Sequence, residues 1–384
     1  MIMSQINARN LSNENEDGAP DIVGVSTFSA TSYFVPPKGT TAQRPQNPQG
    51  GDLRFNTDSA SLEYYRGDTI GWEQIEMTSP DLNGAARGVF ALGRVGPASS
   101  NTLEYINIAT IGNSIDFGDL TVARRRFAAA SSRTRGLFAG GFQDPADSDV
   151  IDYITTASTG NATDFGNLTS SARTIAGLSD ATRGVFAGNE VPTQLNVIQY
   201  VTIAQTGNAV DFGDTTRVGH QATTCSSSTR GLFAGVFGGS SPLGNDSRID
   251  YITIATTGDA TDFGDQTGAY SVRGGGSNSI RGLFAGGSSA PARINVIDYV
   301  TIATKGDATD FGDLIIPVSN FCGVPTSSTR AVFAGGYGAS PFPKVNVISY
   351  VEIMTTGNSK DFGDLTTDAA FGSAGSCSNA HGGL

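Results

Sequence analysis

Six copies of the tripeptide Asp-Phe-Gly are the residues of this chain that most suggest chemistry. In phosphoryl-transfer enzymes such a tripeptide supplies an aspartate that binds magnesium beside a nucleotide. That site also needs a glycine-rich phosphate loop, a strand lysine and an HRD-like segment, none of which occurs in this sequence. Six copies therefore indicate architecture, with the phenylalanines as packing residues. They are Phe117, Phe165, Phe212, Phe263, Phe311 and Phe362.

Other candidate chemistry is sparse. The two histidines, His220 and His381, stand in no nucleophile–base–acid spacing, and the three cysteines form no CxxC pair. Carboxylates are plentiful, but spacing singles out no glycosidase pair. Aspartates in turns, such as Asp259, Asp262 and Asp265, are possible calcium ligands, although turn chemistry explains them without a metal. We predict no catalytic residue, no cofactor and no metal.

The Asp-Phe-Gly copies belong to a longer repeat of 47 to 51 residues. A segment RG(V/L)FAG opens each copy, and a tyrosine follows it, always 12 residues before the phenylalanine. The length varies mainly between the arginine and the tyrosine, so insertions gather in one loop. The arginines are Arg87, Arg135, Arg183, Arg230, Arg281 and Arg330, and the tyrosines are Tyr105, Tyr153, Tyr200, Tyr251, Tyr299 and Tyr350.

A Gly-Asn or Gly-Asp pair, such as Gly258-Asp259, lies between the tyrosine and the phenylalanine. Such a pair between two β-rich runs predicts a hairpin with a two-residue turn. With that turn, Phe263 would lie opposite Ile254, and Tyr251 opposite Gln266. The tyrosine strands are apolar on both faces, which is typical of a sheet stacked between two similar sheets. This pattern favours the blades of a propeller over a two-layer sandwich.

The order of strands resembles the kelch repeat: an apolar strand ending in Gly-Gly, a variable loop, a tyrosine strand, a tight turn, and an aromatic strand. The Gly-Gly pairs include Gly140-Gly141 and Gly286-Gly287, and phenylalanine stands where kelch repeats usually have tryptophan. The resemblance implies an all-β fold containing a six-bladed kelch-like β-propeller. A propeller of the regulator-of-chromosome-condensation type, with a similar period, is the alternative.

The ends of the chain indicate how the propeller closes. The first copy starts at its Gly-Gly strand, and the last copy continues into "DAAFGSAGSCSNAHGGL". We therefore expect a C-terminal strand, about residues 369–380, to complete the first blade, with His381 aligned to the arginine column. Such closure removes an exposed sheet edge. The predicted domains are an extended arm (1–32), a small β-meander (33–80) and the propeller (81–384).

The meander resembles a module of tailed-bacteriophage structural proteins, especially those of marine cyanophage-like virions. The resemblance rests on "GTTAQRP…GGDLRFNTDSASLEYYRGD…WEQI", and repeats like "NVIDYVTIATTGNATDFGDL" resemble those of predicted virion proteins of such phages. It implies a virion protein that is attached to other virion proteins through residues 1–80. A meander this small buries too little apolar area to stand alone, so it should pack on another copy or another protein, and we expect a homo-oligomer.

The variable loops are the candidate binding surface, because selection for the fold does not determine their sequences. Aromatic and polar residues among Pro, Ser and Gly suit contact with a protein or glycan of the host surface, unless the loops fold back on the blade. The candidates are Phe142, Asp144, Phe237, Leu243, Tyr337 and Phe342.

The repeated residues Arg135, Tyr153, Phe165, Arg183, Tyr200 and Phe212 are interpreted as structural. The arginine column would pair with the aspartate before each phenylalanine and tie strands or neighbouring blades together. The alternative is a ring of arginines that binds an anionic ligand. A contact present in every blade usually serves the blade, so we favour the first.

Composition agrees with these predictions. Charged residues make up 16% of the chain, and its net charge of −12 argues against a nucleic-acid partner. No apolar run is long enough to cross a bilayer, and no signal peptide is visible. We predict a non-enzymatic virion component (tail fibre, neck or capsid appendage) that displays its propeller. The alternatives are a glycan-degrading phage appendage and a cellular kelch-like adaptor.

Overall fold

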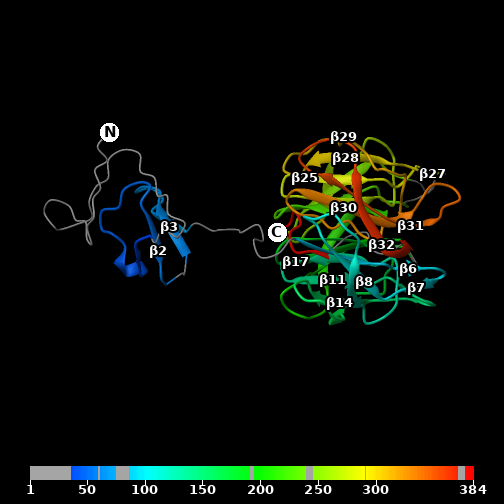
Figure 1. The fold of residues 1–384 in the computed structure, drawn as a ribbon, viewed down its shortest axis with the longest axis horizontal. Coiled ribbons are helices and arrows are strands. Elements are labelled where there is room, and N and C mark those ends of the chain that lie inside the picture. Colours follow the sequence, from blue (N-terminus) through cyan, green and yellow to red (C-terminus); the bar gives the residue numbers. More distant parts are fainter. Residues whose placement is uncertain are drawn as a thin grey trace, which may run out of the picture. The chain divides into compact units, whose positions relative to one another are not determined.

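The computed structural model describes residues 36–58, 61–74, 86–190, 194–238, 245–289, 291–370 and 377–384. The predicted arm, residues 1–32, lies outside them. The described residues form β-strands and one short 3-10 turn, and none of them is α-helical. The chain divides into two compact units, Met1–Ser79 and Pro80–Leu384 (Figure 1).

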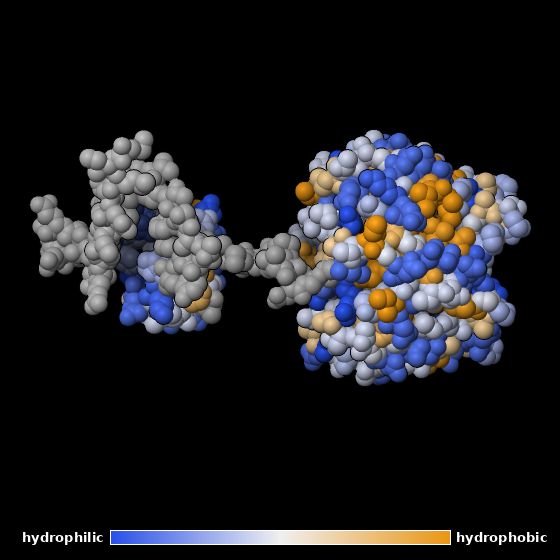
Figure 2. Space-filling model, viewed as in Figure 1, coloured by the Kyte–Doolittle hydropathy of each residue, from blue (hydrophilic) through white to orange (hydrophobic). Residues whose placement is uncertain are grey.

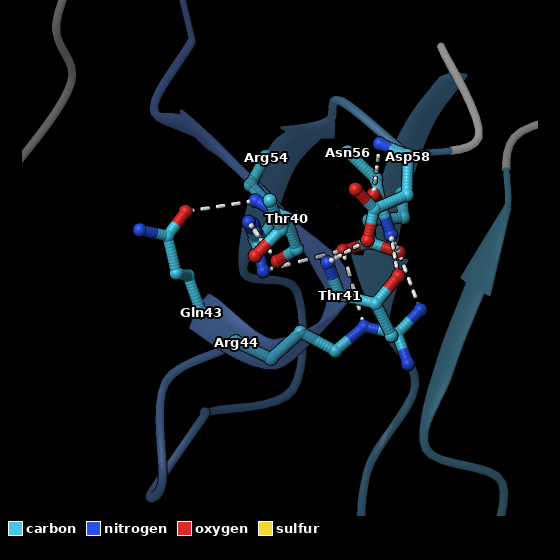
Figure 3. A network of polar contacts seen from close by, with 8 residues as sticks. Thr40, Thr41, Gln43, Arg44, Arg54, Asn56 and Asp58 are labelled. Atoms are coloured by element: carbon cyan, nitrogen blue, oxygen red, sulfur yellow. Dashed lines mark hydrogen bonds and ion pairs between the residues drawn. The ribbon is translucent and has the colours of Figure 1, made fainter.

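The first unit contains one sheet of strand order β1-β2-β3-β4. Its interior is polar: Glu63, Asn56 and Arg54 are 0%, 1% and 5% exposed. Arg44 donates to Glu63 at 2.6 Å and Asn56 donates to it at 3.0 Å, within the network of Figure 3. The elements are β1 (Lys38–Gly39), the 3-10 turn η1 (Thr41–Gln43), β2 (Leu53–Asn56), β3 (Ser61–Tyr65) and β4 (Trp72–Gln74).

The opposite face of this sheet is apolar. Leu53 pairs with Tyr64 and Phe55 with Leu62, so the four side chains share one face, and Leu53 is 41% exposed. Of the unit's described apolar residues, only Tyr65 is buried. The sheet therefore buries its polar face within the unit and leaves its apolar face partly open.

The second unit repeats one four-stranded antiparallel sheet. Each sheet runs from a strand of small residues through the arginine strand and the tyrosine strand to the phenylalanine strand, as the sequence predicts. Sheet 1 is β33 (Cys377–Ser378), β5 (Arg87–Ala91), β8 (Thr102–Asn107), β9 (Ile115–Asp119); sheet 2 is β10 (Ala128–Ser131), β11 (Arg135–Ala139), β14 (Val150–Thr155), β15 (Thr163–Asn167); sheet 3 is β16 (Ala176–Ser179), β17 (Arg183–Asn189), β18 (Leu195–Thr202), β19 (Val210–Gly219).

The remaining sheets follow the same order. In sheet 6 the small-residue segment pairs with β30 only through single bridges, Gly323 to Ala334 and Thr326 to Ala331. Sheet 4 is β20 (Thr223–Ser226), β21 (Arg230–Ala234), β22 (Arg248–Thr253), β23 (Thr261–Asp265); sheet 5 is β24 (Gly274–Ser277), β25 (Arg281–Ala285), β28 (Val296–Thr301), β29 (Thr309–Asp313); sheet 6 is β30 (Arg330–Tyr337), β31 (Lys344–Glu352), β32 (Lys360–Ala370), β6 (Arg94–Val95), β7 (Ala98–Ser99). Two small hairpins are β12 (Phe142–Gln143) with β13 (Ala146–Asp147), and β26 (Ser288–Ser289) with β27 (Ala292–Arg293).

The C-terminal strand pairs with the first sheet, as predicted, although it is shorter. Cys377 lies opposite Val89 in β33 and β5, whereas residues 369–370 still belong to β32. There Ala369 pairs with Val95 of β6, so the red β32 lies beside the cyan β6 and β7 in Figure 1. The two ends of the second unit therefore meet at both sheet 1 and sheet 6.

The predicted hairpin register is wrong. Tyr251 pairs with Thr261 rather than Gln266, and residues 254–260 form a seven-residue loop. The register shifts beside Asp250, so Phe263 is the extra residue of a β-bulge. The packing role of the phenylalanines is confirmed, because each is 2% exposed, and each ring meets the tyrosine ring of its own sheet at 5.8–6.0 Å.

The reason for the wrong register is that the Gly-Asn or Gly-Asp pair binds the preceding sheet. Gly207 donates its N–H to the Phe165 carbonyl at 2.8 Å, and the Asn208 side chain accepts from the Asn167 N–H at 3.0 Å. Every sheet repeats this contact, and Gly112 of sheet 1 donates to Phe362 of sheet 6. The recurring octapeptide thus carries both halves of one inter-sheet contact.

The arginine column forms a second series of contacts between sheets. Each guanidinium lies 4.5–5.0 Å from the tyrosine ring of its own sheet. It also donates to a backbone carbonyl of the next sheet, as Arg135 does to Ile203 at 3.1 Å and Ala204 at 2.9 Å. The last one, Arg330, reaches Ile108 and Ala109 of sheet 1. The predicted pairing with the aspartates is wrong, since none of these ion pairs occurs among the described residues.

Candidate binding site at the variable loops

The predicted loop residues divide into packed and exposed ones. Phe142 is half-buried between two guanidiniums, 4.6 Å from Arg125 and 4.9 Å from Arg173. Asp144 has a side chain that is 71% exposed, 3.6 Å from Arg125. Leu243 lies outside the described residues.

The other three aromatic residues lie in other loops. Phe237 is half-buried, with its ring centroid 5.5 Å from that of His220, and Tyr337 is half-buried beside Ser319. Phe342 is 40% exposed and lies 4.9 Å from the Arg293 guanidinium. Phe142, Phe237 and Tyr337 therefore fold back onto their sheets, and Phe342 remains the exposed aromatic residue of this set.

The links between consecutive sheets share an unusual backbone. Each has one non-glycine residue with a positive φ of 51–62°, and the N–H of Thr174 donates to the carbonyl of Arg126 in the preceding link at 2.7 Å. The residue before it bonds to the backbone that follows the arginine strand, as Arg125 does with Phe142. The positive-φ residues are Arg126, Thr174, Gln221, Val272 and Asn320.

A polar cluster forms where three of these links meet two variable loops. We call Arg126, Asp147, Arg173, Glu190 and His220 the Arg173 cluster. Arg126 lies 2.9 Å from Glu190, and Arg173 lies 3.6 Å from Glu190 and 3.5 Å from Asp147. Their side chains are 16–28% exposed, whereas His220 is 6% exposed. The ion pairs of the cluster are thus partly open to solvent, whereas His220 is buried.

The environment shifts the pKa values of these groups in different directions. Burial lowers the pKa of His220, so its imidazole is neutral at pH 7. Burial raises the pKa of Asp147. The pKa of Glu190 is lowered, because a hydrogen bond from Thr174 and the charge of Arg126 outweigh its burial. The pKa values of the neighbouring carboxyl groups of Asp147 and Glu190 are therefore shifted in opposite directions.

This cluster was not predicted from the sequence. No motif in the sequence marks Arg173, and His220 stands in no catalytic spacing. A signal does exist: the first of the two link residues that share the backbone contact is Arg or His in the first three links (Arg125, Arg173 and His220) and Ser in the last two. Only knowledge of the shared backbone reveals these positions as equivalent.

A second polar site lies at the small-residue strands. Hydroxyl groups donate to carbonyls from strand to strand, as Ser179 does to Ser131 at 2.8 Å and Ser226 does to Ser179 at 2.8 Å. These strands line a cavity of about 30 Å³, which is room for a water molecule or two. His381 also borders the cavity.

The last residues of the chain cover this site. His381 donates through Nε2 to the Ser131 carbonyl at 2.7 Å and accepts through Nδ1 from the Gly383 N–H at 3.0 Å. A Cβ atom on Gly383 would lie 2.0 Å from the Ser179 carbonyl oxygen, so only glycine fits. His381 does not take the place in the arginine column that the alignment predicted. The tail instead turns across the small-residue strands.

No protein-family model matches this chain, and a search of curated proteins finds no similar sequence. Among the described residues, no helix has the length and apolar character needed to cross a membrane. Within the same residues, no group of three or more His, Cys, Asp or Glu is placed to hold a metal ion.

Proposed function

We propose that residues 81–384 form a six-bladed kelch-like β-propeller. Two independent series of hydrogen bonds support this, because each runs from sheet to sheet in chain order and returns from sheet 6 to sheet 1. Pairing of β33 with β5 adds a further reason for closure, since one blade then contains strands from both ends of the repeat region.

The function that this architecture favours is that of a structural, non-enzymatic virion component of a tailed phage. Residues 1–80 would attach it to other virion proteins as a homo-oligomer, and the propeller would display its loops to a host-surface glycan or protein. The observation that carries the proposal is the division into two units, of which the first leaves the apolar face of Leu53, Phe55, Leu62 and Tyr64 partly open. The second unit has scattered apolar patches among hydrophilic surface, which suits display in water (Figure 2).

Immunogold labelling of intact phage particles with antibody to residues 81–384 tests this proposal. We expect label at the tail, neck or capsid surface of particles whose genome encodes this chain. Particles from a mutant that lacks the gene are the control. Label confined to cell lysate, with none on purified particles, would contradict a virion location.

A second candidate function, cleavage of a surface glycan, is supported by the neighbouring carboxyl groups of Asp147 and Glu190. Their pKa values are shifted in opposite directions, as general acid and base catalysis requires. New reducing ends from host polysaccharide, produced by the full chain and abolished by Glu190→Gln, would favour the enzyme.

A further inference from the structure

The charges of the Arg173 cluster are not required by the fold. The last two links have the same backbone contact and positive-φ geometry with Ser271-Val272 and Ser319-Asn320. The early links build it with Arg125-Arg126 and Arg173-Thr174 instead. Within a repeat protein, a side chain that the repeated backbone does not need is a candidate for binding.

The cluster also contains polar atoms without hydrogen bonds. His220 is only 6% exposed, and its Nδ1 atom has no hydrogen-bond partner among the described residues. Arg173 Nε and Asp147 Oδ1 also have no hydrogen-bond partner there: Nε lies 3.6 Å from Glu190 Oε2, and Oδ1 lies 3.5 Å from Arg173 Nη1, which are ion-pair distances. Buried polar groups are normally hydrogen-bonded, so three such atoms together indicate a place where other atoms bind.

The chemistry of these atoms restricts the ligand. Two arginines and two carboxylates around a neutral imidazole sum to no net charge, which disfavours a strongly anionic or cationic ligand. The donor Arg173 Nε and the acceptor Asp147 Oδ1, which make ion-pair contacts but no hydrogen bond, suit a ligand that both donates and accepts within a short distance. A sugar hydroxyl does both.

We propose that the Arg173 cluster is a binding site for a neutral hexose unit of a glycan. The guanidiniums of Arg125 and Arg173 already lie over the Phe142 ring, so recognition here is by hydrogen bonds rather than by stacking on that ring. The proposal rests on the proposed display of the loops to a host surface, and it names the chemical class that they bind.

Histidine NMR of the full-length protein tests the proposal directly. The chain has two histidines, so the imidazole signals of His220 and His381 can be assigned with single His→Gln variants. Neutral oligosaccharides (glucan, mannan and galactan fragments) and an oligouronate are added in turn. We expect a neutral saccharide to shift the His220 signals saturably while those of His381 stay unchanged.

Affinity measurements on variants complete the test. Arg173→Gln and the nearly isosteric Glu190→Gln are expected to weaken binding of that saccharide at least tenfold, with unchanged unfolding temperature for Glu190→Gln. Arg293→Gln is the matched control, because it removes another arginine stacked on a loop phenylalanine, away from the cluster. Its affinity should equal that of the parent.

Three outcomes would overturn the proposal: no neutral saccharide shifts His220, only the oligouronate does, or Glu190→Gln binds like the parent. Each would leave virion labelling unaffected, so failure of the site is distinguishable from failure of the proposed function.

Discussion

At the scale of single residues, the glycine of Asp-Phe-Gly has a clear physical role. Gly166 has a φ of +149°, and a Cβ atom built there would lie 2.3 Å from the carbonyl oxygen of Gly207 in the next sheet. The contact brings two backbones together more closely than any side chain allows. A motif that suggests magnesium chemistry is thus explained by close approach of backbones.

We expect Gly166→Ala to lower the free energy of unfolding by about 3 kcal/mol, because the methyl group clashes with the neighbouring backbone. Urea unfolding followed by circular dichroism measures it. The matched control is Gly207→Ala, on the other side of the same contact: its positive φ of +159° brings nearly the same backbone strain as at Gly166, but nothing lies within 4 Å of the added Cβ, so the difference between the two variants measures the clash. Equal losses from the two variants would contradict this explanation.

At the scale of elements, the arginine column joins neighbouring sheets. Arg135 combines stacking on Tyr153, at 4.8 Å, with two carbonyl acceptors in sheet 3. A lysine retains the charge but has neither the planar face nor the fork of donors.

We therefore expect Arg135→Met to destabilise the protein by about 2 kcal/mol and Arg135→Lys by about 1 kcal/mol. Arg133→Met is the control, since Arg133 is exposed and lies two residues earlier in the same turn. The midpoint of urea unfolding reports all three. A loss from Arg133→Met as large as that from Arg135→Met would show that surface charge alone is responsible.

Strand order was predictable from the sequence because repetition and apolar patterning are local signals. The small-residue, arginine, tyrosine and phenylalanine strands occur as expected, as does the pairing of the C-terminal segment with β5. The predicted hairpin register is wrong because a Gly-Asn pair is typical of a hairpin turn, whereas Gly207 and Asn208 form hydrogen bonds with the preceding sheet. The predicted partners of the arginines are wrong for a similar reason: the arginines bond to backbone carbonyls of another sheet, and a backbone carbonyl is present at every residue, so the sequence does not mark it.

The candidate site was only partly predictable. The variable hairpin of Phe142 and Asp144 does border the Arg173 cluster. Glu190 and His220 were missed, because they approach one another through packing of three sheets and no spacing along the chain records that.

At the scale of the whole molecule, the C-terminal tail makes stability depend on pH. Burial lowers the pKa of His381 to about 4, against an ordinary value near 6.5. Between these values the unfolded chain binds a proton that the folded chain does not, so stability falls as the pH falls from 6.5 to 4. The reason is local: a proton on Nδ1 would end its acceptance of the Gly383 N–H.

We expect the free energy of unfolding to decrease over this pH range by more in the parent than in His381→Gln, with a difference of at most about 3 kcal/mol. The variant is needed for comparison because burial raises the pKa of Asp250, and such a group makes the folded state more stable as the pH falls, which opposes the effect of His381. Calorimetry at pH 7, 5.5 and 4.5 provides the measurement. Parallel pH profiles for the two proteins would exclude His381 as the cause.

Completion of sheet 1 by β33 has a consequence for biosynthesis. The strand that β5 needs, β33 (Cys377–Ser378), follows every strand of sheets 2 to 5 in the chain, so it is synthesised after all of them. Sheets 2 to 5 can assemble as they emerge, whereas the first-made sheet waits with one edge unpaired for the last-made strand. A truncation before Cys377 would therefore damage a sheet that was synthesised near the start of the repeats.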